Sequence, residues 1–176
     1  MANSSKSMRL APLSVLVVDD NAQMRSIVGT VLRAAGVGSI HYAPNGVVAL
    51  QMIADRQIDV VYVDYEMPVM DGLQFISAIR SVDSAHPYMP IIMLTGHSDV
   101  ARLNDARDRG VTEFLCKPVT SNDLLKRLEA VIAHQRPFID SGEYFGPDRR
   151  RRQVVGHRGP WRRAGDLQTE HHLGEN

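Results

Sequence analysis

The sequence is poor in cysteine and has no long apolar run near its start. Cys116 is the single cysteine among 176 residues, which excludes an internal disulfide framework and a zinc site built from several thiolates. The first apolar run, at 15–18, is far shorter than a secretory signal core or a membrane span of about 20 residues. We therefore expect a soluble, cytoplasmic protein without membrane insertion. We expect the lone thiol to be a small buried hydrophobic residue rather than a catalytic nucleophile.

The chain also lacks net charge, because 20 Lys and Arg residues balance 20 Asp and Glu residues. The balance is uneven along the sequence, since residues 147–163 contain seven arginines, one aspartate and no lysine. A positive block at one end suggests an anionic partner. The use of arginine instead of lysine favours bidentate recognition of phosphate or of guanine edges over simple charge neutralisation.

Residues 13–134 alternate short apolar runs with amphipathic stretches. We predict strands at 15–18, 58–63, 91–94 and 112–116, with a weaker candidate at 39–43. We predict helices at 22–35, 46–54, 73–82, 99–109 and 122–134, and Gly36 and Gly110 stand where helix C-caps belong. Five strands alternating with five helices indicate an α/β fold, a doubly wound five-stranded parallel sheet covered on both faces. Residues 1–12 are expected to be a disordered lead-in.

Polar side chains follow four of the predicted strands directly. Asp19 and Asp20 follow the first strand, Asp64 follows the third, and Thr95 and Lys117 follow the last two. Open parallel sheets bind their ligands at the carboxyl ends of the strands, so these groups are expected to lie at one edge. Three converging carboxylates repel one another unless a hard divalent cation such as Mg²⁺ binds among them. The added hydroxyl and ammonium suit phosphoryl oxygens, so the pattern predicts a carboxylate nucleophile for phosphoryl transfer.

In these features residues 14–134 resemble a receiver domain of the CheY type, which has a flavodoxin-like fold and serves bacterial two-component signalling. The resemblance rests on spacing: 44 residues from Asp20 to Asp64, 31 from there to Thr95 and 22 from there to Lys117. The loop that follows the third strand, with Met67-Pro68 and Asp71-Gly72, matches as well.

The resemblance implies a role for each of these residues. Asp64 would be the phosphoacceptor, and Thr95 and Lys117 would bind the phosphoryl oxygens. Asp20 and Asp64 would bind Mg²⁺ directly, Asp19 partly through water, and the backbone carbonyl of Glu66 would complete the ligands. A cis peptide before Pro118 is also implied, as is a histidine kinase or a phosphotransfer protein as the phosphoryl donor. The chain would not be an enzyme beyond Mg²⁺-dependent phosphoryl transfer to its own aspartate.

Residues 135–176 form an Arg-rich extension that contains too few aliphatic residues to build a core. We expect this segment to be largely disordered and to order when it binds its ligand. It has neither the length nor the periodicity of a helix-turn-helix output domain or an output enzyme. It does contain an approximate repeat, since Gly146-Pro147-Asp148-Arg149-Arg150 is followed by Gly159-Pro160-Trp161-Arg162-Arg163.

Arginines interleaved with aromatic residues suit a guanine nucleotide that carries phosphodiesters, because both side-chain types stack on bases. A receiver followed by such a stretch resembles the Cle proteins, a family of CheY-like cyclic di-GMP effectors. The resemblance implies a single-domain response regulator that binds cyclic di-GMP and acts on the flagellar motor switch protein at the flagellar base. The implied ligand-binding residues are Tyr144, Asp148, Arg149, Arg150, Arg151, Arg152, Trp161, Arg162 and Arg163. Two alternatives remain open: a chemotaxis-type or phosphorelay receiver with an inert tail, and a nucleic-acid-binding regulator.

Overall fold

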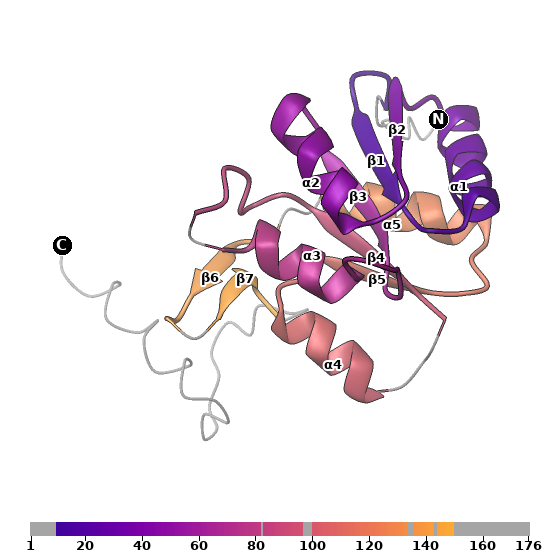
Figure 1. The fold of residues 1–176 in the computed structure, drawn as a ribbon. Helices are drawn as coiled ribbons and strands as arrows, with labels where there is room; N and C mark the ends of the chain where they lie inside the picture. Colours follow the sequence, from indigo (N-terminus) through magenta and orange to yellow (C-terminus); the bar gives the residue numbers. More distant parts are fainter. Residues whose placement is uncertain (1–9, 82, 97–99, 134–135, 143, 150–176) are drawn as a thin grey trace, which may run out of the picture.

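A parallel sheet with helices on both faces forms the body of the molecule (Figure 1). The computed structural model describes residues 10–81, 83–96, 100–133, 136–142 and 144–149. In this part of the chain the sheet has five strands in the order β2-β1-β3-β4-β5. The strands are β1 (Ser14–Val18), β2 (Ser39–Ala43), β3 (Val60–Asp64), β4 (Ile91–Thr95) and β5 (Glu113–Cys116). The helices are α1 (Ala22–Ala34), α2 (Gly46–Asp55), α3 (Gly72–Ile79), α4 (Val100–Asp108) and α5 (Ser121–Ala133).

The predicted order of elements is confirmed, including the weaker second strand. β3 begins two residues later than predicted, because Asp59 is used in the turn before it. The Asp59 side chain accepts a hydrogen bond from the Ser14 amide at 2.8 Å, and its own amide donates to the Ser14 carbonyl. Gly36 and Gly110 end α1 and α4 with φ angles of +90° and +91°, a backbone conformation that favours glycine.

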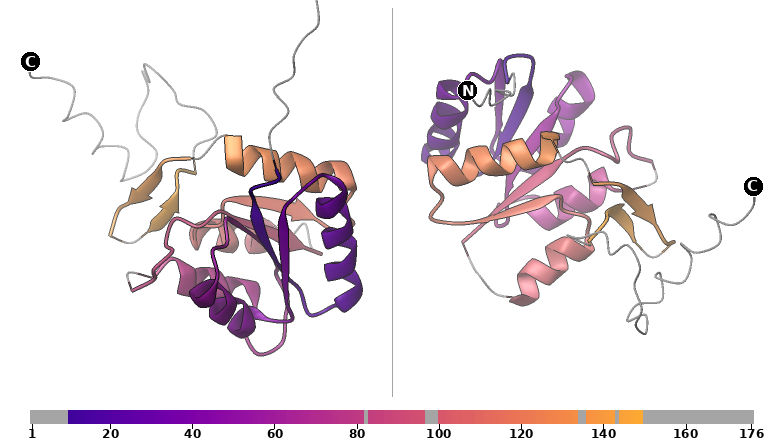
Figure 2. Two further views of the ribbon diagram at one scale, coloured as in Figure 1. Left: turned by 90° about the horizontal axis from the view of Figure 1, so that it is seen from above. Right: turned by 180° about the vertical axis from the view of Figure 1, so that it is seen from behind.

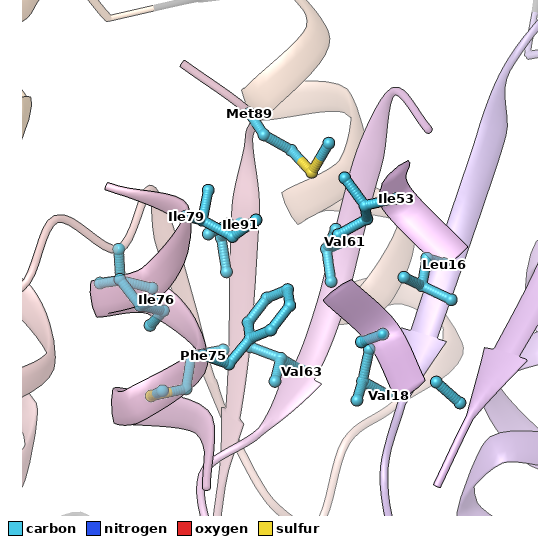
Figure 3. Close-up of a cluster of buried hydrophobic side chains, with 14 of the residues drawn as sticks. Leu16, Val18, Ile53, Val61, Val63, Phe75, Ile76, Ile79, Met89 and Ile91 are labelled. Carbon is cyan, nitrogen blue, oxygen red and sulfur yellow. The ribbon is translucent and has the colours of Figure 1, made fainter. Parts of the chain in front are cut away.

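Two apolar layers hold the helices on the sheet. Successive side chains of a strand point to opposite faces, so Leu16 and Val18 of β1 join one cluster, whereas Val15 and Val17 join the other. The first cluster lies under α2, α3 and α4 and includes Phe75 of α3 (Figure 3). The second lies under α1 and α5. Because both faces are covered, the central strands are apolar at nearly every position, which is why they show as continuous runs in the sequence.

A short antiparallel hairpin follows α5, and the sequence analysis did not predict it. It consists of β6 (Phe138–Asp140) and β7 (Phe145–Pro147), with Phe138 opposite Pro147. The Ser141 amide donates to the Tyr144 carbonyl at 3.0 Å and closes the turn, in which Gly142 has a φ of +79°. Both views of Figure 2 place the hairpin at the opposite end of the molecule from α1.

The hairpin packs against the α/β body through aromatic rings and close backbone contact. The Tyr88 ring lies edge-on to Phe138 and Phe145, with centroids 5.0 and 5.5 Å apart. A Cβ atom at Gly146 would lie 2.8 Å from the Gly110 Cα atom, so only glycine allows this approach. The hairpin is thus joined to the end of α4 that leads into β5.

No helix among the described residues is long and apolar enough to cross a membrane. The proposed lead-in at 1–12 lies mostly outside the described residues, as does the Arg-rich extension beyond Arg149.

Candidate functional site

Three carboxylates meet at the carboxyl end of the sheet, as predicted. Asp19 and Asp20 follow β1, and Asp64 ends β3, its neighbour in the sheet. One oxygen of each lies within 4.8 Å of those of the other two. Asp19 is fully buried, Asp64 is 8% exposed and Asp20 faces solvent. A cluster of hard oxygen ligands with one solvent-facing member fits Mg²⁺, which usually keeps several water ligands.

Lys117 forms ion pairs with both buried carboxylates. Its Nζ atom lies 2.8 Å from Asp64 Oδ1 and 3.1 Å from Asp19 Oδ2. Thr95, at the end of β4, is 2% exposed, and its carbonyl accepts a hydrogen bond from the Lys117 amide at 2.7 Å. The Lys117–Pro118 peptide is cis, which confirms the prediction. The structure thus brings together the Asp64 carboxylate, Thr95 and the Lys117 ammonium, as the strand ends predicted.

A cavity of about 110 Å³ opens beside the Asp64 carboxylate and is lined by Thr95, Gly96 and Lys117 with the loop after β3. Burial raises the pKa of Asp64, the Lys117 ammonium opposes this rise, and the Asp19 charge adds to it. Burial alone would lower the pKa of Lys117, but its hydrogen bonds and attraction to Asp64 and Asp19 outweigh burial and raise it. The ammonium is therefore charged at neutral pH, and Lys117 lines the same cavity as Asp64.

Two arginines that the sequence analysis did not single out hold the loops around this cluster. Arg25 of α1 donates through Nη1 to the backbone carbonyls of Asp19 at 2.6 Å and Asp20 at 3.1 Å. Arg102 of α4 forms an ion pair with the Glu66 side chain, and its guanidinium lies 5.3 Å from the centre of the Tyr65 ring. No local pattern marks Arg102, because 36 residues separate it from its partner. The predicted metal ligand at Glu66 is the backbone carbonyl, which this ion pair does not use.

Three of the nine predicted ligand-binding residues lie in the described part of the extension. The Arg149 guanidinium lies 3.7 Å from the centre of the Tyr144 ring. The Tyr144 hydroxyl donates to the Pro147 carbonyl at 2.8 Å, and the Asp148 amide donates to the Pro137 carbonyl at 2.8 Å. The other six, Arg150, Arg151, Arg152, Trp161, Arg162 and Arg163, lie outside the described residues.

The prediction that Cys116 is buried is wrong, since its side chain is exposed. β5 is an edge strand, and only alternate residues of it are covered: Glu113 and Leu115 are buried. Cys116, the last residue of the strand, instead lines a groove between α4, α5 and the hairpin. An apolar run in the sequence does not reveal which strand will lie at the edge of the sheet.

Known chemotaxis proteins are similar to this chain in sequence and in fold. Chemotaxis protein CheY-3 of Vibrio cholerae is 31% identical over 119 residues, which are 68% of this chain and 91% of that protein. Chemotaxis protein CheY1 of Helicobacter pylori is 35% identical over 121 residues, 68% of this chain and 97% of that protein. The solved structure of the chemotaxis response regulator CheY4 of Vibrio cholerae matches with a TM-score of 0.63 at 34% identity. That match covers 68% of this chain and 98% of the other.

The family model that matches is described as the response regulator receiver domain and covers residues 15–129. The hairpin and the Arg-rich segment lie outside this match. The match spans most of the sequence and includes every residue of the acidic cluster, Thr95 and Lys117, so the chain belongs to the response regulator receiver domain family.

Proposed function

We propose that this response regulator accepts a phosphoryl group on Asp64, binds cyclic di-GMP through its Arg-rich extension, and regulates the flagellar motor switch protein. The observation that carries the receiver half of the proposal is the pairing of a buried Asp64 carboxylate with Lys117 at 2.8 Å beside a small polar cavity. The protein would act in the cytoplasm and be recruited to the flagellar base. The phosphoryl donor would be a histidine kinase or a phosphotransfer protein.

In the proposed phosphoryl transfer, one carboxylate oxygen of Asp64 attacks the phosphorus of a phosphohistidine. The P–N bond of the donor breaks, its imidazole leaves with the bonding electrons, and an acyl phosphate forms on Asp64. The Lys117 ammonium and the Thr95 hydroxyl donate hydrogen bonds to the phosphoryl oxygens as negative charge builds up on these oxygens. Mg²⁺, bound by Asp19, Asp20, Asp64 and the Glu66 carbonyl, would supply further charge neutralisation.

The proposal for the extension rests on its composition, on the resemblance to the Cle family and to its member CleD, and on one contact. Arg149 is stacked on Tyr144, so a cation and an aromatic face stand together where the hairpin leads into the Arg-rich segment. Guanine bases stack on such faces, and guanidinium groups bind both phosphate oxygens and the O6/N7 edge of guanine. The flagellar motor switch as partner is taken from the same resemblance, and chemotaxis proteins are among the relatives of the receiver.

A calorimetric titration of cyclic di-GMP into the full chain tests the ligand, with cyclic di-AMP as the control. We expect tight binding of the guanine compound alone, and loss of it in a variant with Arg149→Ala and Arg163→Ala. Unchanged affinity in that variant would contradict the proposal. A chain with an inert tail would give no heat. A nucleic-acid-binding regulator would instead bind many sequences, with an affinity that falls steeply with salt.

Phosphorylation is tested separately with acetyl phosphate and Mg²⁺, using mass spectrometry of the intact chain. The wild type and an Asp55→Asn control, changed at the end of α2, should both gain one phosphoryl group. Asp64→Asn should gain none. A phosphoryl group on the Asp64→Asn chain would show that the acceptor lies elsewhere.

A further inference from the structure

A groove separates the hairpin from the receiver on the side of α4 and β5. Its volume is about 790 Å³, and it is lined by Arg107 of α4, Phe114 of β5, and Tyr144 and Arg149 of the hairpin. The groove thus contains two of the predicted ligand-binding residues together with side chains of the receiver. This raises the question of whether the receiver itself contributes to the binding of an anion.

One carboxylate at the end of α4 lies close to both of these guanidinium groups. Asp108 Oδ1 lies 3.0 Å from Arg149 Nη1 and 3.7 Å from Arg107 Nε. Arg149 also donates through Nη2 to the Asp108 backbone carbonyl at 3.4 Å. A cation of the extension and a cation of the receiver therefore share a single acidic oxygen.

Both guanidinium groups have hydrogen-bonding capacity left over. The Nε atoms of Arg107 and Arg149 are buried, and neither has an acceptor at hydrogen-bond distance within the described part of the chain. The Asp108 oxygen, 3.7 Å from Arg107 Nε, is too far away to accept a hydrogen bond from it. A buried N–H donor without an acceptor is costly, by about 1–3 kcal/mol in proteins. Two such donors beside one shared carboxylate make an incomplete site, which an oxyanion with more than one free oxygen would complete.

We propose that Arg107 and Arg149 together bind a phosphate group of the nucleotide, and that the Asp108 carboxylate occupies the position of that phosphate until it is displaced. This inference rests on the proposed binding of cyclic di-GMP to the extension, and it adds α4 of the receiver to the site. A phosphodiester carries the same single charge as a carboxylate and has two free oxygens, which suits two guanidinium forks.

Displacement of Asp108 is inexpensive because its side chain is 53% exposed and can turn into water. Exposed ion pairs of this kind contribute little, so the phosphate replaces a weak partner. The Arg149 guanidinium lies 3.7 Å from the centre of the Tyr144 ring, and this contact keeps the cation beside the hairpin when the phosphate binds. Uptake of the ligand would in this way replace the Arg149–Asp108 ion pair with a phosphate held between Arg149 and Arg107.

The test is a titration of cyclic di-GMP into full-length variants that differ at single positions of α4. Arg107→Gln should weaken binding about tenfold, which corresponds to the loss of one charge-assisted hydrogen bond. Arg109→Gln is the matched control, because Arg109 contacts Asp105 and Ser77 instead. Asp108→Asn should tighten binding about two- to fivefold, since it weakens the competing ion pair. Asp105→Asn is its matched control.

The outcomes separate this inference from the proposed function. If the wild type does not bind cyclic di-GMP, both are overturned. If the wild type binds and Arg107→Gln binds as well as Arg109→Gln, the shared phosphate site is overturned while the function stands. Equal affinity of Asp108→Asn and Asp105→Asn would overturn the displacement of the carboxylate.

A second measurement does not depend on any substitution. In ¹⁵N spectra of the wild-type side chains, the Nε–H signal of Arg107 should shift when cyclic di-GMP is added, and that of Arg109 should not. An unmoved Arg107 signal at saturating nucleotide would overturn the proposal even if the Arg107→Gln chain proved poorly folded.

Discussion

Arg80, at the end of α3, offers the sharpest test of how the hairpin is attached to the receiver. Its side chain is buried, and its guanidinium donates to the carbonyls of Gly110 at 3.0 Å, Pro87 at 2.7 Å and Met89 at 2.8 Å. The Phe138 ring of the hairpin covers it, with the guanidinium carbon 5.1 Å from the ring centre. Among the described residues Arg80 has no acidic partner, so the hydrogen bonds to its buried charge come from three backbone carbonyls.

Replacing Arg80 with methionine keeps an unbranched apolar stem and removes the three donors. Each buried carbonyl that loses its donor costs about 1–3 kcal/mol, whereas the change also relieves the cost of burying a charge. We expect a net loss of about 2–4 kcal/mol in the free energy of unfolding, because three neutral carbonyls lose their donor and the relief from burying a charge offsets part of that cost. Burial lowers the pKa of Arg80 to about 10, so the group stays protonated and the loss should be constant between about pH 6 and 9.

Equilibrium unfolding in urea, followed by far-UV circular dichroism, measures this loss. Arg56→Met is the matched control, because Arg56 is also the C-cap of a helix but is exposed, and it should change stability by less than about 0.5 kcal/mol. Hydrogen exchange should speed up at the Asp148 amide, which closes the hairpin. A loss below about 1 kcal/mol for Arg80→Met would refute the reasoning, since the three carbonyls would then not depend on Arg80.

Two further predictions concern the core and a helix cap. The Tyr62 hydroxyl donates to the Leu124 carbonyl at 2.8 Å, so Tyr62→Phe should cost about 1–2 kcal/mol in urea unfolding. Burial raises the pKa of Tyr62 above its usual 10. The stabilisation by the protonated Tyr62 hydroxyl is therefore complete below about pH 10 and is lost as the pH rises further. The Tyr62→Phe chain should lack this loss of stability at alkaline pH. Asp71 and Gln74 form a capping box on α3, and Asp71→Ala should lower the thermal unfolding temperature by the equivalent of about 1 kcal/mol.

The sheet and the acidic site were predictable because their signals are local. A strand covered on both faces must be apolar almost throughout, so each central strand shows as a run such as Val60–Val63. Parallel strands end at one edge, so the residue after each run is automatically part of one site. The placement of Asp19, Asp64, Thr95 and Lys117 follows from these two facts alone.

The hairpin and the arginine contacts were not predictable, because they depend on partners far away in the sequence. Strands of three residues carry almost no periodicity, and this pair is held by Tyr88 on a distant loop. Arg149 is 41 residues from Asp108, and the composition of the extension indicated only its charge. The burial of Cys116 was predicted wrongly for the same reason, since strand order in the sheet is a tertiary property.

α4 connects the two inputs that the proposed function assigns to this protein, and this leads to a quantitative prediction. Its Arg102 pairs with Glu66, two residues beyond Asp64, and its last residue, Asp108, pairs with Arg149 of the extension. If a phosphoryl group or its analogue on Asp64 moves α4, the affinity of the extension for cyclic di-GMP should change by some factor. By thermodynamic linkage the nucleotide must then change the affinity for a phosphoryl analogue by the same factor.

Beryllofluoride with Mg²⁺ serves as that analogue, because it binds the acceptor reversibly and both affinities can then be measured by calorimetry. We expect a coupling of about five- to tenfold, the lower part of the range for coupled sites. We also expect it to shrink toward one in Asp108→Asn, which weakens the contact between α4 and the extension, and to persist in Asp105→Asn. Equal affinities with and without the second ligand, in either order, would show that α4 does not transmit between the sites. The receiver and the extension would then be independent modules that share only a chain.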